Sequence, residues 1–343
     1  PYEGLIAEPY TTDDCLLFRR RQPETTPPGN ELIAAPWQAG VSDQVDLLAG
    51  ARQPLDTPGE FVYAWGQLGR KVLAATNTGG VHVFDVEARK WSTFRKPDGM
   101  SHQIYSTINY ENSLLLGHYP SGELFDFDGE KLTRLRDQPP AMPGVSRSAR
   151  EAQTLAIYGG ELYAGVWPWG EVWRKDRRAN TWRFMGRMFT HPAPTDKTTH
   201  PYENETKALD DVLNRWGQRV TSLVPFGDSL LISTSAKGPN PYEAKFTFLD
   251  GDKWKEYGSV YRYRKEGALS VPFRWKSSGT RFEFQFDGKH LVVSQDGTRI
   301  GTAECQSPLS ARAARLVERD GVFGALSPSI ELNDIDFDLQ VRP

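Results

Sequence analysis

Residues 108–127, INYENSLLLGHYPSGELFDF, decide the fold because the chain repeats their pattern. The pattern is a short strand, a tight Asn, Asp or Gly turn, a strand rich in small residues, a Gly-containing turn and an aromatic strand. It returns at residues 65–85 (WGQLGRKVLAATNTGGVHVFD), 157–175 (IYGGELYAGVWPWGEVWRK) and 224–248 (VPFGDSLLISTSAKGPNPYEAKFTF). A charged turn and a strand with Trp or Leu follow each copy. Four strands per unit, repeated every ~40–50 residues, predict a β-propeller.

Working outward, the repeat predicts where the blades lie. The predicted blades are residues 57–96, 100–136, 148–186 and 216–260. An insertion at 188–216 interrupts the spacing, and its KALDDVLNRW segment indicates a short helix. Long insertions in a repeat array usually lie on one face and often serve binding. We therefore expect the insertion to contribute to a functional site.

The two ends of the chain lack the repeat. Residues 1–56 are expected to be an irregular arm that contributes to ring closure, with one short strand at 15–18. Within the C-terminal β segment, residues 261–343, strict alternation at 280–286 and alternation with one slip at 330–337 predict strands. These strands are either further blades or a small packed sheet. The expected fold is all-β: a propeller of five to seven four-stranded blades, with its ring closed by the N- and C-terminal segments.

Composition restricts the function classes. The 343 residues carry a net charge of −3, which excludes a general polyanion-binding footprint and gives no reason to expect a nucleic-acid partner. No apolar run is long enough to span a bilayer, so no membrane partner is expected. The only cysteines are Cys15 and Cys305. They form either a disulfide near the point of ring closure, which favours an exported protein, or two buried thiols. We expect a secreted or periplasmic monomer.

Strand order predicts which turns share a face. When the strands of each blade run outward from the axis, the turns between second and third strands and the connections between blades lie on one face. The segments placed there are 76–80, 101–103, 118–122, 147–151, 166–170, 215–219, 235–238 and the insertion. They surround one mouth of the central channel.

Aromatic and cationic side chains gather at this mouth. Sugar rings stack their flat apolar faces on Trp and Tyr, and arginines bind a carboxylate or sulfate in bidentate fashion. The combination predicts an anionic polysaccharide or oligosaccharide as the partner. The candidate substrate-binding residues are Tyr119, Arg150, Trp167, Trp169, Arg215 and His200. Arg150 and Arg219 have an alternative interpretation as surface charges or hydrogen-bond donors within a blade.

The motif content narrows the chemistry. The sequence lacks a GxSxG elbow, an HExxH helix and a phosphate loop. His191 and His200 lack a close third ligand, so we expect no metal site and no cofactor, while a structural calcium or other ion stays open. A set of His, Tyr and Arg suits β-elimination on a uronic acid. That reaction needs a neutralised carboxylate, a base for the C5 proton and an acid for the leaving oxygen.

The blade repeat, the segment GHYPSGELFDFDG at 117–129 and the histidine one strand earlier resemble propeller-fold polysaccharide lyases, in particular ulvan lyases. Those enzymes cleave a sulfated rhamnose–uronate polymer of green algae. The resemblance covers about residues 57–260. It implies two histidines, a tyrosine and an arginine at the mouth. Here it assigns the catalytic roles to His118, His102, Tyr202 and Arg219.

The expected function is therefore a polysaccharide lyase that cleaves a uronate-containing, ulvan-like glycan by β-elimination. Tyr158, Tyr163 and Arg174 are alternative assignments within this function. One alternative function is a non-catalytic carbohydrate-binding or scaffold propeller. Another is a propeller glycoside hydrolase, for which Glu151 and Glu203 are the candidate carboxylates.

Overall fold

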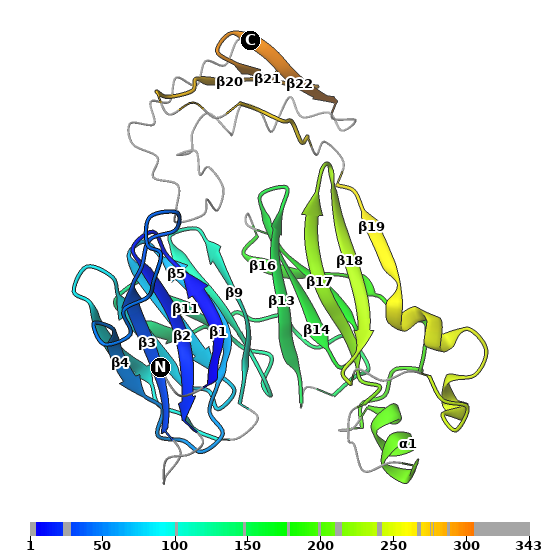
Figure 1. The fold of residues 1–343 in the computed structure, drawn as a ribbon. Helices are drawn as coiled ribbons and strands as arrows, with labels where there is room; N and C mark the ends of the chain where they lie inside the picture. Colours follow the sequence, from blue (N-terminus) through cyan, green and yellow to red (C-terminus); the bar gives the residue numbers. More distant parts are fainter. Residues whose placement is uncertain are drawn as a thin grey trace.

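Figure 1 shows the fold as a computed structural model. It describes residues 5–22, 29–99, 102–146, 149–176, 179–197, 200–209, 215–238, 242–265, 269–274, 276, 278–286 and 289–304. Over these residues the chain is all-β, with four four-stranded and two three-stranded antiparallel sheets. Each sheet is a meander whose strands pair in the order of the sequence, so the local repeat maps directly onto separate sheets.

The strands of the first five sheets follow one another along the chain. The first sheet comprises β1 (Leu5–Thr11), β2 (Cys15–Gln22), β3 (Gly29–Pro36) and β4 (Ala51–Pro54), and the second comprises β5 (Val62–Leu68), β6 (Lys71–Thr76), β7 (Val81–Asp85) and β8 (Lys90–Arg95). The third sheet comprises β9 (Ile104–Tyr110), β10 (Ser113–His118), β11 (Leu124–Phe127) and β12 (Leu132–Arg134), and the fourth comprises β13 (Glu151–Tyr158), β14 (Glu161–Trp167), β15 (Glu171–Asp176) and β16 (Thr181–Arg187). The fifth sheet comprises β17 (Gln218–Phe226), β18 (Ser229–Ala236) and β19 (Val260–Tyr263). The second to fourth sheets match the first three predicted blades closely, and the fifth sheet overlaps the fourth predicted range, 216–260.

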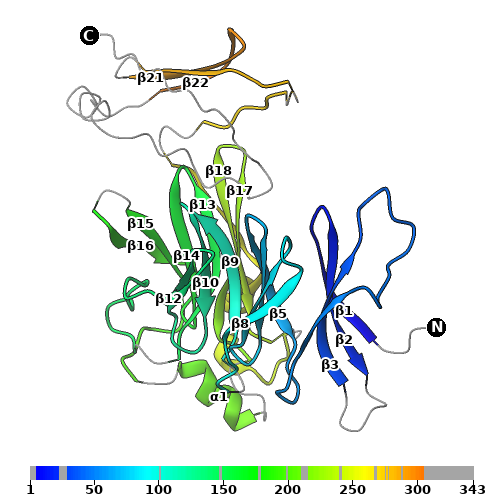
Figure 2. The same cartoon turned by 90° about the vertical axis from the view of Figure 1, so that its left-hand side faces the viewer.

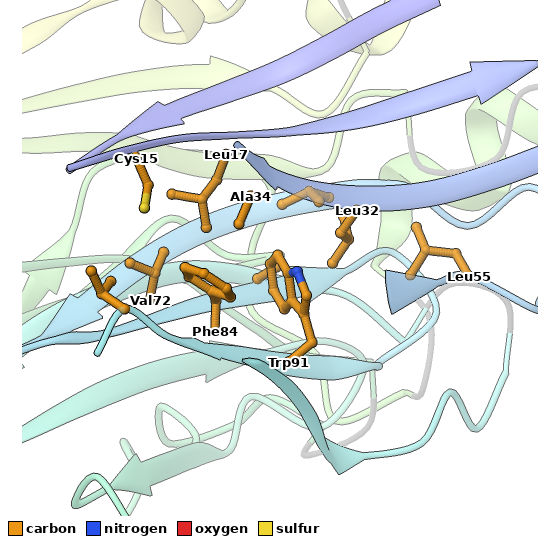
Figure 3. Packing of buried hydrophobic residues seen from close by; sticks show 11 residues of the cluster. Cys15, Leu17, Leu32, Ala34, Leu55, Val72, Phe84 and Trp91 are labelled. Atoms are coloured by element: carbon orange, nitrogen blue, oxygen red, sulfur yellow. The ribbon is translucent and has the colours of Figure 1, made fainter. Parts of the chain in front are cut away.

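The sheets pack face to face through apolar residues that alternate along their strands. The first strands β5, β9, β13 and β17 contact one another in that order. Between the first two sheets, Leu17 and Leu32 meet Val72, Phe84 and Trp91, as Figure 3 shows. Equivalent clusters fill the next three gaps between sheets. Side-by-side meanders joined through their first strands are the arrangement of propeller blades.

The N-terminal arm differs from the prediction, because it forms a complete four-stranded sheet and not an irregular segment. The strand pattern is obscured by three consecutive arginines in CLLFRRRQ. Arg19 donates to Glu8 at 2.8 Å, and Arg20 pairs with Glu31, so their charges are neutralised at the sheet surface. Cys15 is a buried thiol of the core; Cys305 lies outside the described residues, so the predicted disulfide stays untested.

The fifth sheet also differs from the prediction. The segment expected to be its outer strand forms the 3-10 helix η2 (Lys253–Gly258), which follows η1 (Thr247–Leu249). The ion pairs Asp250–Lys253 and Asp252–Lys255 join side chains three residues apart, a spacing that suits a tight helical turn. The third strand is supplied by β19. Trp254 is consequently not a core residue of a strand; it is exposed and stacks on Tyr242.

The last sheet joins β20 (Phe282–Phe286), β21 (His290–Gln295) and β22 (Thr298–Glu304), which confirms a strand within 280–286. Figures 1 and 2 show it beyond the hairpin of β17 and β18, at the end of the molecule opposite helix α1 (Pro201–Leu209). That helix begins earlier than the predicted one. The predicted strand at 330–337 lies outside the described residues. Among the described residues, no helix has the length and apolarity needed to cross a membrane.

Candidate functional site

We use "the mouth" for the end of the second to fifth sheets that carries the turns β6–β7, β10–β11 and β14–β15 and the residues after β18. Near this end, the first strand of each of these sheets has one residue more than its partner. The extra residues are Tyr63, Tyr105, Gln153 and Thr221. A β-bulge breaks the alternation of a strand and re-aims a side chain, and such bulges are common beside functional sites.

A compact cation cluster lies at the mouth. The Lys237 Nζ lies 4.4 Å from the ring centroids of both Tyr119 and Trp167. It is 3.9 Å from Glu151 Oε2, and Arg219 Nη2 is 3.1 Å from Glu151 Oε1. The five side chains come from three sheets, so only the folded arrangement brings them together. Both cations contact this one buried carboxylate.

Burial perturbs the titration of this cluster. It raises the pKa of Glu151, although Arg219 and Lys237 oppose the shift. It lowers the pKa of Lys237, which Glu151 opposes. Glu203, on α1, has its pKa raised to about 7 by burial against the opposing charge of Lys237. Strongly perturbed groups that converge in one place are typical of functional sites.

A histidine pair lies beside the cation cluster. The His102 and His118 rings meet edge to face with centroids 6.1 Å apart. His102 Nδ1 is 2.9 Å from Asp98 Oδ1, and Arg95 holds Asp98 in turn. A carboxylate at Nδ1 requires the proton on that nitrogen, so Nε2 of His102 keeps its lone pair. His102 is therefore oriented as a proton acceptor.

His118 has a different environment. Its Nδ1 is hydrogen-bonded to Ser121 Oγ at 2.8 Å, and burial, helped by Arg95, lowers its pKa to about 4. It is therefore neutral at physiological pH. Its position at the end of β10 directly precedes Tyr119, so the histidine pair and the cation cluster share the turn after β10.

Several buried polar atoms at the mouth have no hydrogen-bond partner. Native structures contain few such atoms, and each one needs an explanation, such as a water or a ligand. Those found here among the described residues are Gln103 Oε1, His118 Nε2, Gln153 Oε1, Trp167 Nε1 and Arg219 Nε. Donors and acceptors of both kinds suit a polar ligand, such as a sugar.

Tyr202 differs from the other three predicted catalytic residues in its surroundings. Its hydroxyl is hydrogen-bonded to His191 Nδ1 at 2.7 Å, and its ring packs in a buried cluster with Trp216 and Phe246. His200 is also buried, against Trp169 with centroids 4.4 Å apart, and burial lowers its pKa to about 3. Tyr202 thus packs α1 beside Trp216, just before β17, and His200 packs the residue before α1 against Trp169, just after β14. Large aromatic rings gain most from such burial.

Several predicted binding residues are buried and not exposed. Arg150 donates to the Pro139 carbonyl at 2.8 Å and to Glu171 at 2.9 Å, so its role here is that of a structural ion pair. Trp167 is 0% exposed and Trp169 2%. Trp167 reaches the site only as the support of Lys237. Tyr119 is half-buried at the mouth, as a binding role requires.

The side chain of Arg215 contacts Phe246 and Glu243. Its guanidinium is 5.6 Å from the Phe246 ring centroid, and Nη1 is 3.7 Å from Glu243. Sequence reasoning missed Lys237 and Asp98. The only signal for Lys237 was its place in the turn at 235–238, where a single lysine in SAKGPN is not distinctive.

Two further observations concern metal binding and the position of the main cavity described. Among the described residues, no group of three or more His, Cys, Asp or Glu side chains is arranged to hold a metal ion. A cavity of about 1010 Å³ lies at the opposite ends of the first three sheets, beside Tyr10, Gln38, Trp65 and Asn109. None of the predicted site residues lines that cavity.

No protein-family profile and no curated protein matches the chain. Among solved structures, the N-terminal domain of Nup159 is similar at 11% identity, with 83% of this chain and 72% of that chain covered and a TM-score of 0.37. BamB from Moraxella catarrhalis is similar at 12% identity, with 82% of this chain and 79% of that chain covered and a TM-score of 0.37. YjhT is similar at 9% identity, with 86% of this chain and 83% of that chain covered and a TM-score of 0.38. With TM-scores below 0.5, these likenesses add nothing to the description of the fold or the site.

Proposed function

We propose that this protein is a polysaccharide lyase that cleaves a uronate-containing, ulvan-like glycan by β-elimination at the mouth. The observation that carries the proposal is the shared turn after β10: His102, held by Asp98, contacts His118 there, and Lys237, which shares Glu151 with Arg219, lies over Tyr119. The cations supply the charge that a substrate carboxylate needs. His102 supplies a base with a free lone pair.

The proposed reaction assigns each proton. Arg219 and Lys237 neutralise the sugar carboxylate and stabilise the negative charge that develops on it. His102 Nε2 takes the proton from C5, and the electron pair of that bond forms the C4–C5 double bond. The C4–O4 bond breaks, and the leaving oxygen takes a proton from the phenol of Tyr119. Tyr119 replaces Tyr202 in this role because the Tyr202 hydroxyl is bonded to His191. His118, neutral and buried, positions His102.

The test is to incubate the protein with a panel of uronate polysaccharides and to follow ultraviolet absorbance, because elimination leaves a conjugated unsaturated uronate. We expect absorbance to rise with an ulvan-like polymer. His102→Ala should lower kcat at least a hundredfold, the range for loss of a general base. Lys237→Met should raise KM and also lower kcat, because Lys237 binds the carboxylate and stabilises the charge that develops on it.

Matched controls separate chemistry from folding. His290→Ala changes a histidine on β21, in the sheet at the opposite end of the molecule, and should leave activity unchanged. Circular dichroism should show native β structure in every variant. Full activity in His102→Ala, or no unsaturated product from any polymer of the panel, would refute the proposal.

A second candidate function is glycoside hydrolysis. It is favoured by two carboxyls of raised pKa, Glu151 and Glu203, that both interact with Lys237. Two carboxyls with different environments are the usual acid and base of glycosidases. New reducing ends without a rise in absorbance would support this function. Binding without either product would support a carbohydrate-binding propeller.

We also propose that the sheets close into a propeller ring of five to seven blades through the N- and C-terminal segments. Support comes from the fifth sheet, whose outer face exposes Val224 and Phe226 where a propeller packs its next blade. We propose a secreted or periplasmic monomer, because a polysaccharide substrate is extracellular.

A further inference from the structure

A row of aromatic rings leads away from the cation cluster across the mouth. Successive ring centroids are 6.0 Å apart from Trp167 to Tyr119, 6.3 Å from Tyr119 to Tyr105, 4.8 Å from Tyr105 to Tyr63 and 5.6 Å from Tyr63 to Phe61. The rings come from β14, the turn after β10, β9, β5 and the residue before β5. The row thus crosses three sheets without a break.

The backbone explains how the row is continuous. Tyr63 and Tyr105 are the extra residues of the bulges in β5 and β9. Without the bulge, each position would follow the alternation of its strand and face one of the packed gaps between sheets. The bulges instead place the two tyrosines next to each other, edge to face, across the boundary between sheets.

The charge along the row is uneven. Lys237 lies over Tyr119 and Trp167, and the Arg219 guanidinium lies 5.3 Å from the Tyr105 centroid. Among the described residues, no cation lies over Tyr63 or Phe61. Tyr63 is 40% exposed, so its ring is accessible to a ligand. One end of the row therefore suits the carboxylate of an acidic sugar, and the other offers an aromatic ring without a cation over it.

We propose that the accessible rings of the row form a track for an extended glycan, in which Tyr63, supported by Phe61, stacks on the sugar next to the uronate held by Arg219 and Lys237. The inference rests on the proposed function for the identity of the acidic sugar. It adds a second sugar position beside the uronate, and it assigns the preference for a polymer over a single sugar to Tyr63. Aromatic faces bind sugars through apolar contact, so a single ring contributes about a tenfold change in affinity.

The experiment measures binding apart from cleavage. In a His102→Ala background, Tyr63→Ala is compared with its parent for affinity to ulvan, by affinity electrophoresis, and to a uronate monosaccharide, by calorimetry. We expect about tenfold weaker binding to the polymer and unchanged binding to the monosaccharide. Tyr63→Phe keeps the ring and should bind like the parent. Tyr261→Ala, at a tyrosine 36% exposed on β19, is the matched control and should have no effect.

Each outcome decides the inference. Equal polymer affinity in Tyr63→Ala and its parent would overturn it, as would equal weakening for polymer and monosaccharide, or no polymer binding at all. Thermal unfolding of Tyr63→Phe and Tyr63→Ala separates lost stacking from lost stability. Tyr63-dependent polymer binding by a wild-type protein that forms no unsaturated product would refute the lyase function and leave the track intact.

Discussion

At the scale of single residues, the mouth combines two carboxyl groups with two cations. Arg219 and Lys237 contact Glu151, while Glu203 approaches Lys237 from the insertion. The pKa of Glu203 is about 7 because its carboxyl is buried, so its charge changes near neutral pH. The net charge that a substrate meets therefore depends on this one group.

Glu203→Gln should remove a pH dependence of binding. As pH falls from about 8 to about 6, Glu203 takes up a proton and the mouth becomes more positive, whereas a uronate stays ionised. Affinity of the wild type for a uronate oligosaccharide should then rise several-fold, while Glu203→Gln should bind tightly at both pH values. Calorimetry at the two pH values tests this. Glu205→Gln, on the same helix, should keep the wild-type slope; a parallel slope in Glu203→Gln would contradict the assignment.

At the scale of elements, strands pack closely where glycines allow it. A Cβ on Gly117 would lie 2.2 Å from the Ala152 carbonyl oxygen, so β10 approaches β13 through bare backbone. A backbone atom cannot move aside as the end of a flexible side chain can. The contact holds the third and fourth sheets, and with them His118 and Glu151, in register.

Gly117→Ala should therefore destabilise the protein by about 2–4 kcal/mol, the range for overpacking together with backbone displacement. Urea unfolding followed by circular dichroism measures the change. Gly258→Ala is the control, because a Cβ there meets nothing within 4 Å. Stability equal to wild type in Gly117→Ala would show that the two strands can separate without cost.

The elements also show what the sequence could predict. The blades at residues 57–260 followed from repeated alternation and Gly turns, which are local properties. The first sheet was missed because its arginines find acidic partners on neighbouring strands, Glu8 and Glu31. The outer strand of the fifth sheet was predicted from the charged turn and the tryptophan, Trp254, that follow the repeat. The ion pairs Asp250–Lys253 and Asp252–Lys255 instead suit a helical turn there.

Part of the site was predictable from the order of the strands. Strand order placed His102, His118, Tyr119 and Arg219 on one face, and this needed only topology. Lys237 was missed because its significance comes from two rings and a carboxylate that belong to other sheets. Burial of Arg150 depends on the Pro139 and Pro140 carbonyls, which no spacing rule places beside it.

At the scale of the whole molecule, the fifth sheet has one covered and one exposed face. Its inner face packs on the fourth sheet through Val220 and Leu223. The other face shows Val224, 47% exposed, and Phe226, 71% exposed. Apolar side chains grouped on one face of a sheet are typical of a surface that another element covers.

Phe226→Ser tests whether the ring closes over this face. A covered phenylalanine should lose about 2–3 kcal/mol of stability on this change, whereas a surface position changes by no more than about 0.5 kcal/mol. We expect the larger loss, measured by thermal unfolding of the full chain. Leu48→Ser, at a leucine 81% exposed in the first sheet's last loop, should show the smaller one. Equal small effects would mean that the face is open to solvent.

The four extra residues at Tyr63, Tyr105, Gln153 and Thr221 separate two demands on the same strands. Neighbouring positions must keep their size and polarity, because they fill the gaps between sheets. The inserted positions lie outside these gaps, so we expect a mutation there to change ligand binding more than stability. A lineage of such proteins would be free to acquire new sugar preferences by exchanging these four side chains one at a time.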